Sequence, residues 1–302
     1  MTDRVCVVGA GAIGSLFAAH LARVCEVSVL CRRADHAEAL RRDGLRVSGR
    51  HDFHVSVEAG VSAAELTEPW LVIVATKAAG LEGAVRALAG HWPGAAVMTV
   101  LNGLGAERVV RAHGSWPLIS AVTFMSGTKH SDTHVEYILD TETWLGPWED
   151  TPFALVQRAH DAIVAGGLKA EALPDLRPAQ WSKLIFNATV NGVAALTGLR
   201  HDFHFAEGPL GELVHDLVDE GKAVARAADV PLHDDPWEMN VLATKRGHAH
   251  YPSMLEDVDR GRPTEVELIN GSLVREARER DVPLPLHEAV YALVRGREAS
   301  YA

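Results

Sequence analysis

The sequence predicts an α/β protein in which a doubly wound parallel sheet is followed by an all-helical C-terminal domain. Three observations support this fold class. The chain opens on a short apolar run that leads directly into a glycine-rich turn. Up to residue 165, β-rich runs alternate with helical patterns, an order typical of a parallel sheet covered by helices. Beyond Gly166 and Gly167, almost every pattern is helical.

The glycine-rich turn has the spacing of a dinucleotide-binding loop. Residues 4–8 read as a strand, the pattern G-x-G-x-x-G follows, and a helical stretch begins at once. In this setting the first glycine permits the tight turn, the second lets a pyrophosphate approach the backbone, and the third lets the helix pack on the strand. An ordinary glycine-rich turn is the alternative. We predict a Rossmann-type cofactor site whose loop consists of Gly9, Ala10, Gly11, Ala12, Ile13 and Gly14.

The remaining elements of the first half follow from short β-branched runs and from apolar residues that recur every three or four positions. The predicted strands are 4–8, 26–31, 70–76, 96–101 and 118–123, and the predicted helices are 14–23, 35–43, 80–90 and 104–113. The segments 134–138 and 142–146 are expected to add antiparallel strands at the edge of this sheet. A helix over 151–165 follows.

A connector that contains Pro174 and Pro178 separates the two predicted domains. We place the boundary near residue 170, so that residues 1–170 bind the cofactor and residues 171–302 form the helical substrate and catalytic domain. The predicted helices are 179–196, 207–228, 236–247, 263–280 and 286–295. Prolines fall between these runs, where helices start or stop.

The residues after the second predicted strand indicate which dinucleotide binds. Arg32 and Arg33 stand where NAD-binding folds commonly carry an acid that accepts a hydrogen bond from the ribose 2′-OH. A guanidinium binds a 2′-phosphate instead. We therefore predict NADP(H), with Arg32 at the phosphate. Asp35 is the nearby acid that would favour NAD, and a solvated loop is the alternative interpretation of the arginine pair.

Composition excludes several classes of partner. The chain has 302 residues, a length sufficient for two ordinary domains. Of these residues 47% are hydrophobic and 23% charged, as in globular proteins with buried cores. A net charge of −11 argues against nucleic acid or an anionic membrane as the main partner. The 3 cysteines show no metal-ligand spacing, so we expect no metal. Without a signal peptide or a long apolar run, a cytoplasmic location is the expectation.

One predicted helix carries a polar stripe among apolar residues. Lys183, Asn187 and Asn191 are spaced four residues apart and share one helical face. Such a stripe should be partly buried, and buried polar groups need partners that a polar substrate would supply. Burial also lowers the pKa of a lysine, which suits general acid–base catalysis. The alternative is a solvent-facing stripe.

Three further segments are candidates. Pro263 suits the first turn of a helix, where Glu265 would be favoured by the helix dipole, so capping competes with function as its interpretation. Thr76-Lys77 and Asn102-Gly103 close two predicted strands. Because the carboxyl ends of parallel strands line the ligand crevice, these pairs are expected near the nicotinamide ribose or the substrate. Asn-Gly is also a common turn dipeptide.

Together these residues resemble the ketopantoate reductase family, the 2-dehydropantoate 2-reductases, over nearly the whole chain and in the same order. The resemblance rests on the glycine loop, Arg32, Thr76-Lys77, Asn102-Gly-Leu-Gly105, Lys183-x-x-x-Asn187-x-x-x-Asn191, Pro252-Ser-Met254 with Asp257, and Arg262-x-Thr-Glu265 with Asn270-Gly271. It implies NADPH-dependent reduction of a 2-oxo acid to a 2-hydroxy acid, as in pantothenate biosynthesis.

The resemblance also implies roles for individual residues. Lys183 would be the general acid and Glu265 the second catalytic residue, which either orients the lysine or contacts a substrate hydroxyl. The remaining site residues are assigned by ligand: Thr76, Lys77 and Asn102 to the nicotinamide end of the cofactor, and Asn187, Asn191 and Ser253 to the substrate.

Two positions depart from the family pattern near the expected substrate. The family commonly has glutamine before the Asn-Gly pair, where this chain has Leu101, and a family member has a further asparagine where this chain has His201. These departures leave open a reductase of the same architecture that acts on another 2-oxo acid, carbonyl or imine. A non-catalytic NADP(H) sensor is the rival from another class. A monomer and a homodimer are equally compatible with the sequence.

Overall fold

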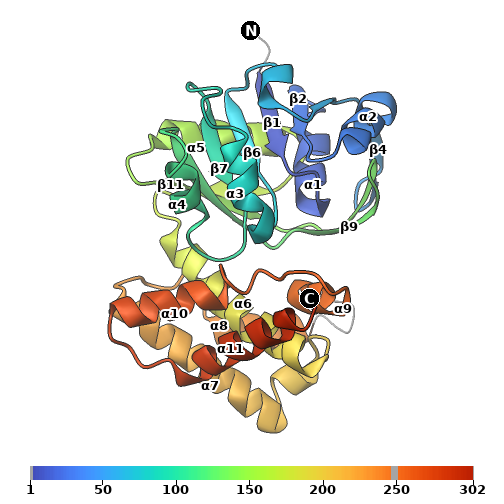
Figure 1. The fold of residues 1–302 in the computed structure, drawn as a ribbon. Coiled ribbons are helices and arrows are strands. Elements are labelled where there is room, and N and C mark those ends of the chain that lie inside the picture. The colour runs from blue at the N-terminus through green and yellow to red at the C-terminus, as the bar shows by residue number, and fades with distance from the viewer. Residues whose placement is uncertain (1–2, 246–250, 302) are drawn as a thin grey trace. The chain divides into compact units, whose positions relative to one another are not determined.

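The computed structural model describes residues 3–245 and 251–301, and the chain divides into two compact units (Figure 1). The sheet unit comprises Met1–Leu101 and Ala106–Leu176, and the helical unit comprises Asn102–Gly105 and Arg177–Ala302. The predicted boundary at residue 170 falls on a short strand of the sheet, β12 (Ala170–Ala172). In the described part of the chain, no helix is long and apolar enough to cross a membrane.

A sheet of eight described strands forms the centre of the sheet unit, in the order β12-β11-β8-β7-β6-β1-β2-β5. Besides β12, its strands are β1 (Arg4–Val8), β2 (Glu26–Leu30), β5 (Glu58–Gly60), β6 (Leu71–Val74), β7 (Ala96–Thr99), β8 (Leu118–Thr123) and β11 (Thr143–Trp148). From β8 to β5 all neighbours are parallel. Because the chain winds outward from β1 in both directions, the predicted doubly wound sheet is confirmed.

Helices cover this sheet. They are α1 (Ala12–Leu21), α2 (Ala34–Asp43), α3 (Ala78–Arg86), α4 (Ala106–Arg111) and α5 (Phe153–Ala165), and a 3₁₀ turn, η1 (Ala63–Glu65), precedes β6. Helix α1 is buried at every residue from Gly14 to Leu21, on all of its faces. A helix that is apolar all round must be covered on both sides. One side of α1 packs on β1 and β2, and the other packs on a second, smaller sheet.

This second sheet has the order β4-β3-β10-β9. Its strands are β3 (Leu45–Gly49), β4 (Phe53–Val55), β9 (Ser126–Ser131) and β10 (His134–Leu139). The prediction that 134–138 lies at the edge of the main sheet is wrong, because Val135 and Tyr137 turn inward against α1. The prediction for 142–146 is confirmed: β11 pairs antiparallel with β8.

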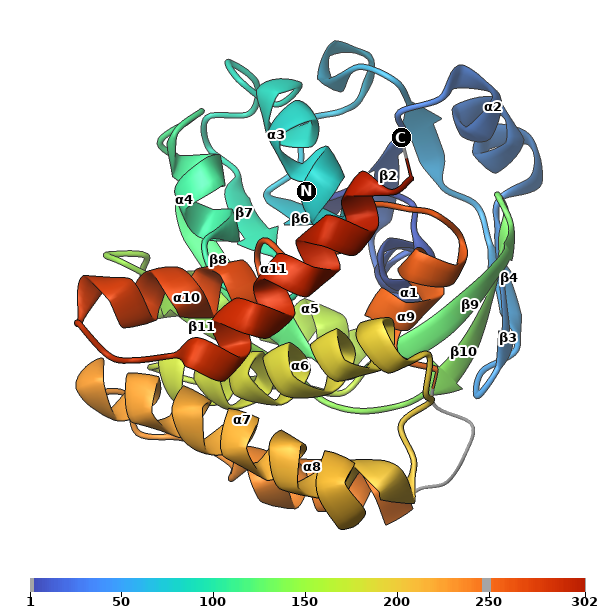
Figure 2. The same cartoon turned by 60° about the horizontal axis from the view of Figure 1, so that its bottom comes forward.

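The helical unit is built around one long helix, α6 (Arg177–Thr197) (Figure 2). The other elements are η2 (Phe203–Phe205), α7 (Gly208–Ala227), α8 (Pro236–Lys245), α9 (Ser253–Asp259), α10 (Asn270–Glu279) and α11 (Pro285–Ala299). Helix α6 packs against α7, α8, α9, α10 and α11, so almost every residue from Ala179 to Ala195 is buried. The last two residues of the predicted helix 236–247 lie outside the described part of the chain.

The predicted helix 263–280 begins later than expected, and this corrects the interpretation of Glu265 as a residue of its first turn. Helix α10 starts at Asn270, which donates its side-chain amide to Ala188 O on α6 at 2.7 Å. Upstream, the N–H and hydroxyl of Thr264 both donate to Glu298 at 2.7 Å. The backbone is thereby held in a turn ahead of the helix, and Glu265 lies in that turn.

Candidate active site

The glycine loop of the sheet unit has the geometry of an anion-binding helix start. The first hydrogen bond of α1 runs from Ser15 N to Gly11 O at 2.9 Å, so the N–H groups before it project from the end of the helix. Its first turn contains no acidic residue. A Cβ at Gly14 would lie within 3.0 Å of the Gly9 carbonyl oxygen, which explains the third glycine of the motif. The loop therefore presents donors and positive dipole charge.

The space around the loop fits a bound dinucleotide. A Cβ added at Gly11 would meet nothing within 4 Å, so the backbone there is open to a ligand. Thr76 lies beside the loop, because a Cβ at Gly9 would come 2.8 Å from its Cγ2. The Thr76 hydroxyl oxygen is buried and has no hydrogen-bond partner among the described residues. A cofactor phosphate or ribose at this edge would fill the open space at Gly11 and would give the Thr76 hydroxyl a hydrogen-bond partner.

The two arginines after β2 are placed differently. Arg33 is the N-cap residue of α2, and its side chain forms ion pairs with Asp35, at 3.6 Å, and with Asp132. The Asp35 carboxylate also accepts a hydrogen bond from His36 N at 2.9 Å, so it caps the first turn of α2. Arg32 is exposed and makes no ion pair with any described residue. Of the pair, Arg32 is therefore the guanidinium that is available to a ligand.

Three polar side chains form a hydrogen-bonded chain in the helical unit. Lys183, on α6, donates from Nζ to Asn102 Oδ1 at 2.8 Å, and Asn102 donates from Nδ2 to Glu265 Oε2 at 2.9 Å. The orientation of the Asn102 amide follows from its partners, because an ammonium only donates and a carboxylate only accepts. The structure thus brings together both residues predicted to be catalytic, and places Asn102 between them.

Burial is the main influence on the charge of Lys183. With 9% of the residue exposed, desolvation lowers the pKa of Lys183 from 10.5 to about 8, and the negative charge of Glu265 opposes this shift. A lysine with this pKa is mostly protonated at pH 7 and gives up its proton far more readily than an exposed lysine does.

Asn102 is held at this place by its own loop. Gly103 has a φ of +91°, which favours glycine, and a Cβ there would lie within 3.0 Å of the Leu268 carbonyl oxygen. The same carbonyl accepts a hydrogen bond from Leu104 N at 3.0 Å. Leu268 and Glu265 belong to the same turn, so this contact fixes the distance between Asn102 and Glu265.

The other predicted substrate residues are distributed along two helices. Asn187 and Asn191 continue the Lys183 face of α6 and are 8% and 6% exposed, so the predicted buried stripe is confirmed. Their side-chain amides make no hydrogen bond to any described residue. Ser253 is exposed at the first residue of α9, which packs on α6. Lys77 is the N-cap residue of α3 in the sheet unit.

His201 does not lie where a substrate could reach it, which corrects the expectation from sequence. The residue is 0% exposed. Its Nε2 pairs with Asn240 Oδ1 at 2.8 Å, and its ring packs against Phe186 and Phe205. A histidine with these neighbours stabilises the core of the helical unit. Leu101, the second departure from the family pattern, directly precedes Asn102 and is partly exposed.

Sequence reasoning missed Glu298, which supports Glu265 from behind. One carboxylate oxygen of Glu298 accepts both Thr264 hydrogen bonds, and Thr264 Oγ1 in turn accepts from Val266 N at 3.1 Å. The two residues that flank Glu265 are therefore anchored and buried. Glu298 lies far along the chain on α11, and an exposed-looking helix offers no sequence signal for this contact.

Comparison with known proteins gives the same family over both units. The family model "Ketopantoate reductase PanE/ApbA" matches residues 5–150, and "Ketopantoate reductase PanE/ApbA C terminal" matches residues 175–298. The chain is 30% identical to the 2-dehydropantoate 2-reductase of Halobacterium salinarum, over 97% of this chain and 98% of the relative. It is 26% identical to that of Pyrococcus abyssi, over 98% of each.

A solved structure shows the same fold. The 2-dehydropantoate 2-reductase from Methylococcus capsulatus superimposes with a TM-score of 0.88 at 28% identity, over 99% of this chain and 98% of that one. The family models together match more than half of the chain. The chain therefore belongs to the ketopantoate reductase family, and it is an oxidoreductase of the class that acts on CH–OH groups.

Proposed function

We propose that this protein uses NADPH to reduce a 2-oxo acid to a 2-hydroxy acid, with 2-dehydropantoate as the substrate and pantoate as the product. The observation that carries the proposal is the buried Lys183 ammonium, hydrogen-bonded to Asn102 and stabilised by Glu265. A carbonyl reduction needs a proton donor at the oxygen, and this arrangement is a proton donor with a tuned pKa. The 2-dehydropantoate 2-reductases that match the chain support the choice of substrate.

In this mechanism the reduced nicotinamide, when bound, supplies the hydride. Lys183 binds the keto oxygen, stabilises the negative charge that develops there, and transfers its proton to it. Asn102 holds Nζ in position, and Glu265 keeps the ammonium protonated until the transfer. Asn187, Asn191 and Ser253 bind the substrate carboxylate and its distal hydroxyl. The amides of the two asparagines make no hydrogen bond within the described part of the chain, so they can serve this role.

The sheet unit binds the dinucleotide. The backbone N–H groups at the start of α1, from Ala12 to Gly14, hold the pyrophosphate, and Gly9 and Gly11 shape the loop around it. Arg32 binds the 2′-phosphate with its guanidinium, which forms no ion pair with a described acid. Thr76 and Lys77 lie beyond β6, at the carboxyl edge of the sheet, and contact the nicotinamide end.

The test is the loss of NADPH absorbance with the purified protein and 2-dehydropantoate, beside NADH and a panel of other 2-oxo acids. Fast turnover that is selective for NADPH and 2-dehydropantoate supports the proposal. If the protein turns over only another 2-oxo acid, the assignments of the cofactor and of the proton donor stand, and the assignment of 2-dehydropantoate as substrate is wrong. Leu101 would then be the first residue to exchange for glutamine. Dinucleotide binding without turnover of any 2-oxo acid would refute the enzymatic mechanism.

Arg32→Ala is expected to remove much of the preference for NADPH over NADH. A phosphate contact by a guanidinium contributes on the order of 1.5–3 kcal/mol, so NADPH affinity should fall about tenfold or more while NADH affinity changes little. Titration of both cofactors by fluorescence measures this ratio. Arg4→Ala, which removes an exposed arginine paired with Glu26 in the same unit, is the control. An unchanged ratio in Arg32→Ala would exclude Arg32 from the 2′-phosphate site.

Glu298→Ala is expected to lower kcat about tenfold, because Thr264 loses its acceptor and Glu265 is no longer fixed beside Asn102. The pH at which kcat falls should move down, since a displaced Glu265 protects the charge of Lys183 less. Glu298→Gln keeps an acceptor oxygen for Thr264 and should behave nearly as the wild type. A pH profile identical in all three proteins would show that Glu298 serves stability alone.

A further inference from the structure

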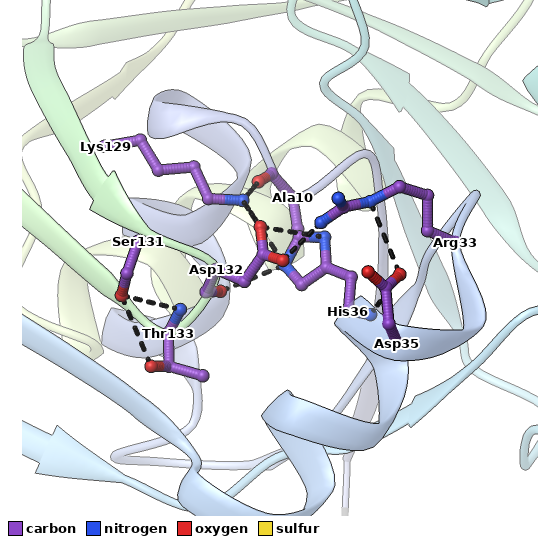
Figure 3. Close-up of polar contacts among 8 residues, drawn as sticks. All are labelled: Ala10, Arg33, Asp35, His36, Lys129, Ser131, Asp132 and Thr133. Carbon is purple, nitrogen blue, oxygen red and sulfur yellow. Dashed lines mark hydrogen bonds and ion pairs between the residues drawn. The ribbon is translucent and has the colours of Figure 1, made fainter.

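A lysine from the second sheet contacts the dinucleotide loop (Figure 3). Lys129, on β9, donates a hydrogen bond from Nζ to the Ala10 carbonyl oxygen at 2.6 Å. Ala10 lies between the first two glycines of the loop. Lys129 is 119 residues away in sequence and belongs to a strand outside the parallel sheet. The Lys129 side chain is only 25% exposed, so the surrounding residues hold its ammonium in this position.

One carboxylate, Asp132, holds this lysine and its neighbours together. Asp132 Oδ1 lies 3.3 Å from Lys129 Nζ, and Oδ2 binds the guanidinium of Arg33. The backbone carbonyl of Asp132 lies 3.0 Å from His36 Nε2. Figure 3 shows Asp132 turned toward the three basic side chains. The turn between β9 and β10 is thereby fastened both to the loop, through Lys129, and to the start of α2.

Burial and neighbouring charges shift the pKa values of this cluster. Burial, and then the neighbouring Lys129, lower the pKa of His36, so His36 is neutral. Burial alone would raise the pKa of Asp132, but the positive charges of Lys129 and Arg33 keep it below its ordinary value, so Asp132 is ionised. Burial lowers the pKa of Lys129 as well, and Asp132 limits this shift. The acid Asp132 therefore faces the bases Lys129 and Arg33 beside the loop.

We propose that Lys129 is a positioning residue for the dinucleotide pyrophosphate, which it serves by fixing the Gly9–Gly14 loop through the Ala10 carbonyl. This inference rests on the proposed dinucleotide site. Holding a carbonyl with a charged donor turns that peptide unit away from the ligand, and it leaves the loop N–H groups free to face an anion. The ammonium also adds a positive charge beside the pyrophosphate.

The role of Lys129 differs from that of Arg32 in what it recognises. The pyrophosphate is common to NADPH and NADH, whereas the 2′-phosphate is present in NADPH alone. Removing Lys129 should therefore weaken the binding of both cofactors by the same factor. Removing Arg32 should weaken the binding of NADPH alone. The two residues lie in the same unit, so the two variants can be compared in the same binding assay.

The experiment measures the Kd of NADPH and of NADH for Lys129→Met, which keeps the length and apolar stem but removes the donor and the charge. We expect both Kd values to rise roughly tenfold, with their ratio unchanged. The loop loses the charge-assisted hydrogen bond that fixes the Ala10 carbonyl, and with it the positive charge beside the pyrophosphate. Lys129→Arg keeps the donor and the charge and should restore most of both affinities. Lys169→Met, which removes a more exposed lysine paired with Asp140 at 3.0 Å, is the matched control and should bind as the wild type does.

A second measurement needs no cofactor. Hydrogen exchange of the backbone amides from Gly9 to Ser15 should be faster in Lys129→Met than in the wild type, with the core strands unchanged. If Lys129→Met does not fold, Asp132→Asn tests the same contact, since it loosens the lysine and should raise both Kd values by a smaller, equal factor.

The outcomes separate this inference from the proposed function. A wild-type protein that binds neither cofactor would refute the proposed function, whatever Lys129 does. Wild-type binding with unchanged Kd values in Lys129→Met would overturn the inference alone. A loss confined to NADPH would also overturn it, because Lys129 would then act at the 2′-phosphate.

Discussion

Replacing Lys183 by methionine is expected to lower kcat by about 10³-fold or more, while the Kd of NADPH stays within about twofold of the wild type. General acid catalysis contributes typically 10²–10⁴-fold, and stabilisation of the developing oxyanion adds to it. Methionine fills nearly the same buried volume on α6, so packing is preserved. The effect should therefore appear in the chemical step, which pre-steady-state oxidation of NADPH measures directly.

Lys222→Met is the control for this substitution. Lys222 lies in the same helical unit, on α7, and forms an ion pair with Asp235 at 2.7 Å. Its removal should cost well under 1 kcal/mol of stability and leave turnover near wild type, because partly exposed ion pairs contribute little. Near-normal turnover in Lys183→Met would exclude Lys183 as the general acid, and an equal loss in both variants would point to unfolding.

The same assignment predicts the direction of the pH dependence. Lys183 donates a proton only while protonated, so kcat for reduction should fall as the pH rises through the folded-state pKa of about 8. Glu265 stabilises the ammonium, and Glu265→Gln removes that charge. The fall should then begin at a lower pH, whereas a role for Glu265 in substrate binding alone would raise KM and leave the profile in place.

The sequence predicted the parts of the site that are local in the chain. The glycine loop is a strand, a turn and a helix start within residues 4–14, and each glycine is explained by a close approach or an open backbone. The face shared by Lys183, Asn187 and Asn191 follows from helical geometry alone. In both cases a local pattern was sufficient: the spacing of the glycines marked the loop, and the helical repeat marked the polar face.

What the sequence could not predict depends on contacts between distant segments. The strand β9 reads Ser-Gly-Thr-Lys-His-Ser and lacks the apolar alternation that marks a strand, so Lys129 gave no signal. The turn residues Asp132 and Thr133 were the available sign that a β-hairpin, and therefore a strand at Lys129, lies here. The sequence predicts a helix at Glu265 because Pro263 suits a first turn. In the structure, Glu298 on α11 binds Thr264 and the helix begins only at Asn270.

Gly14→Ala is expected to destabilise the sheet unit and to weaken dinucleotide binding at least tenfold. Alanine in place of a helical glycine gains up to about 1 kcal/mol from helix propensity. The added Cβ would, however, lie within 3.0 Å of the Gly9 carbonyl oxygen and 3.2 Å from Ala75 Cβ. Overpacking of this kind costs about 1–3 kcal/mol or more, so the clash outweighs the gain. Thermal unfolding and NADPH titration should both show the change.

Gly11→Ala is the matched substitution three residues earlier, and it separates folding from binding. Gly11 has a φ of −72°, which alanine adopts freely, and its added Cβ would meet nothing within 4 Å. The melting temperature should therefore stay close to that of the wild type. NADPH affinity should nevertheless fall, because the methyl group occupies the space through which the pyrophosphate approaches the backbone. Full affinity in Gly11→Ala would mean that the phosphate lies elsewhere, and the G-x-G-x-x-G turn would then be only a tight packing of strand against helix.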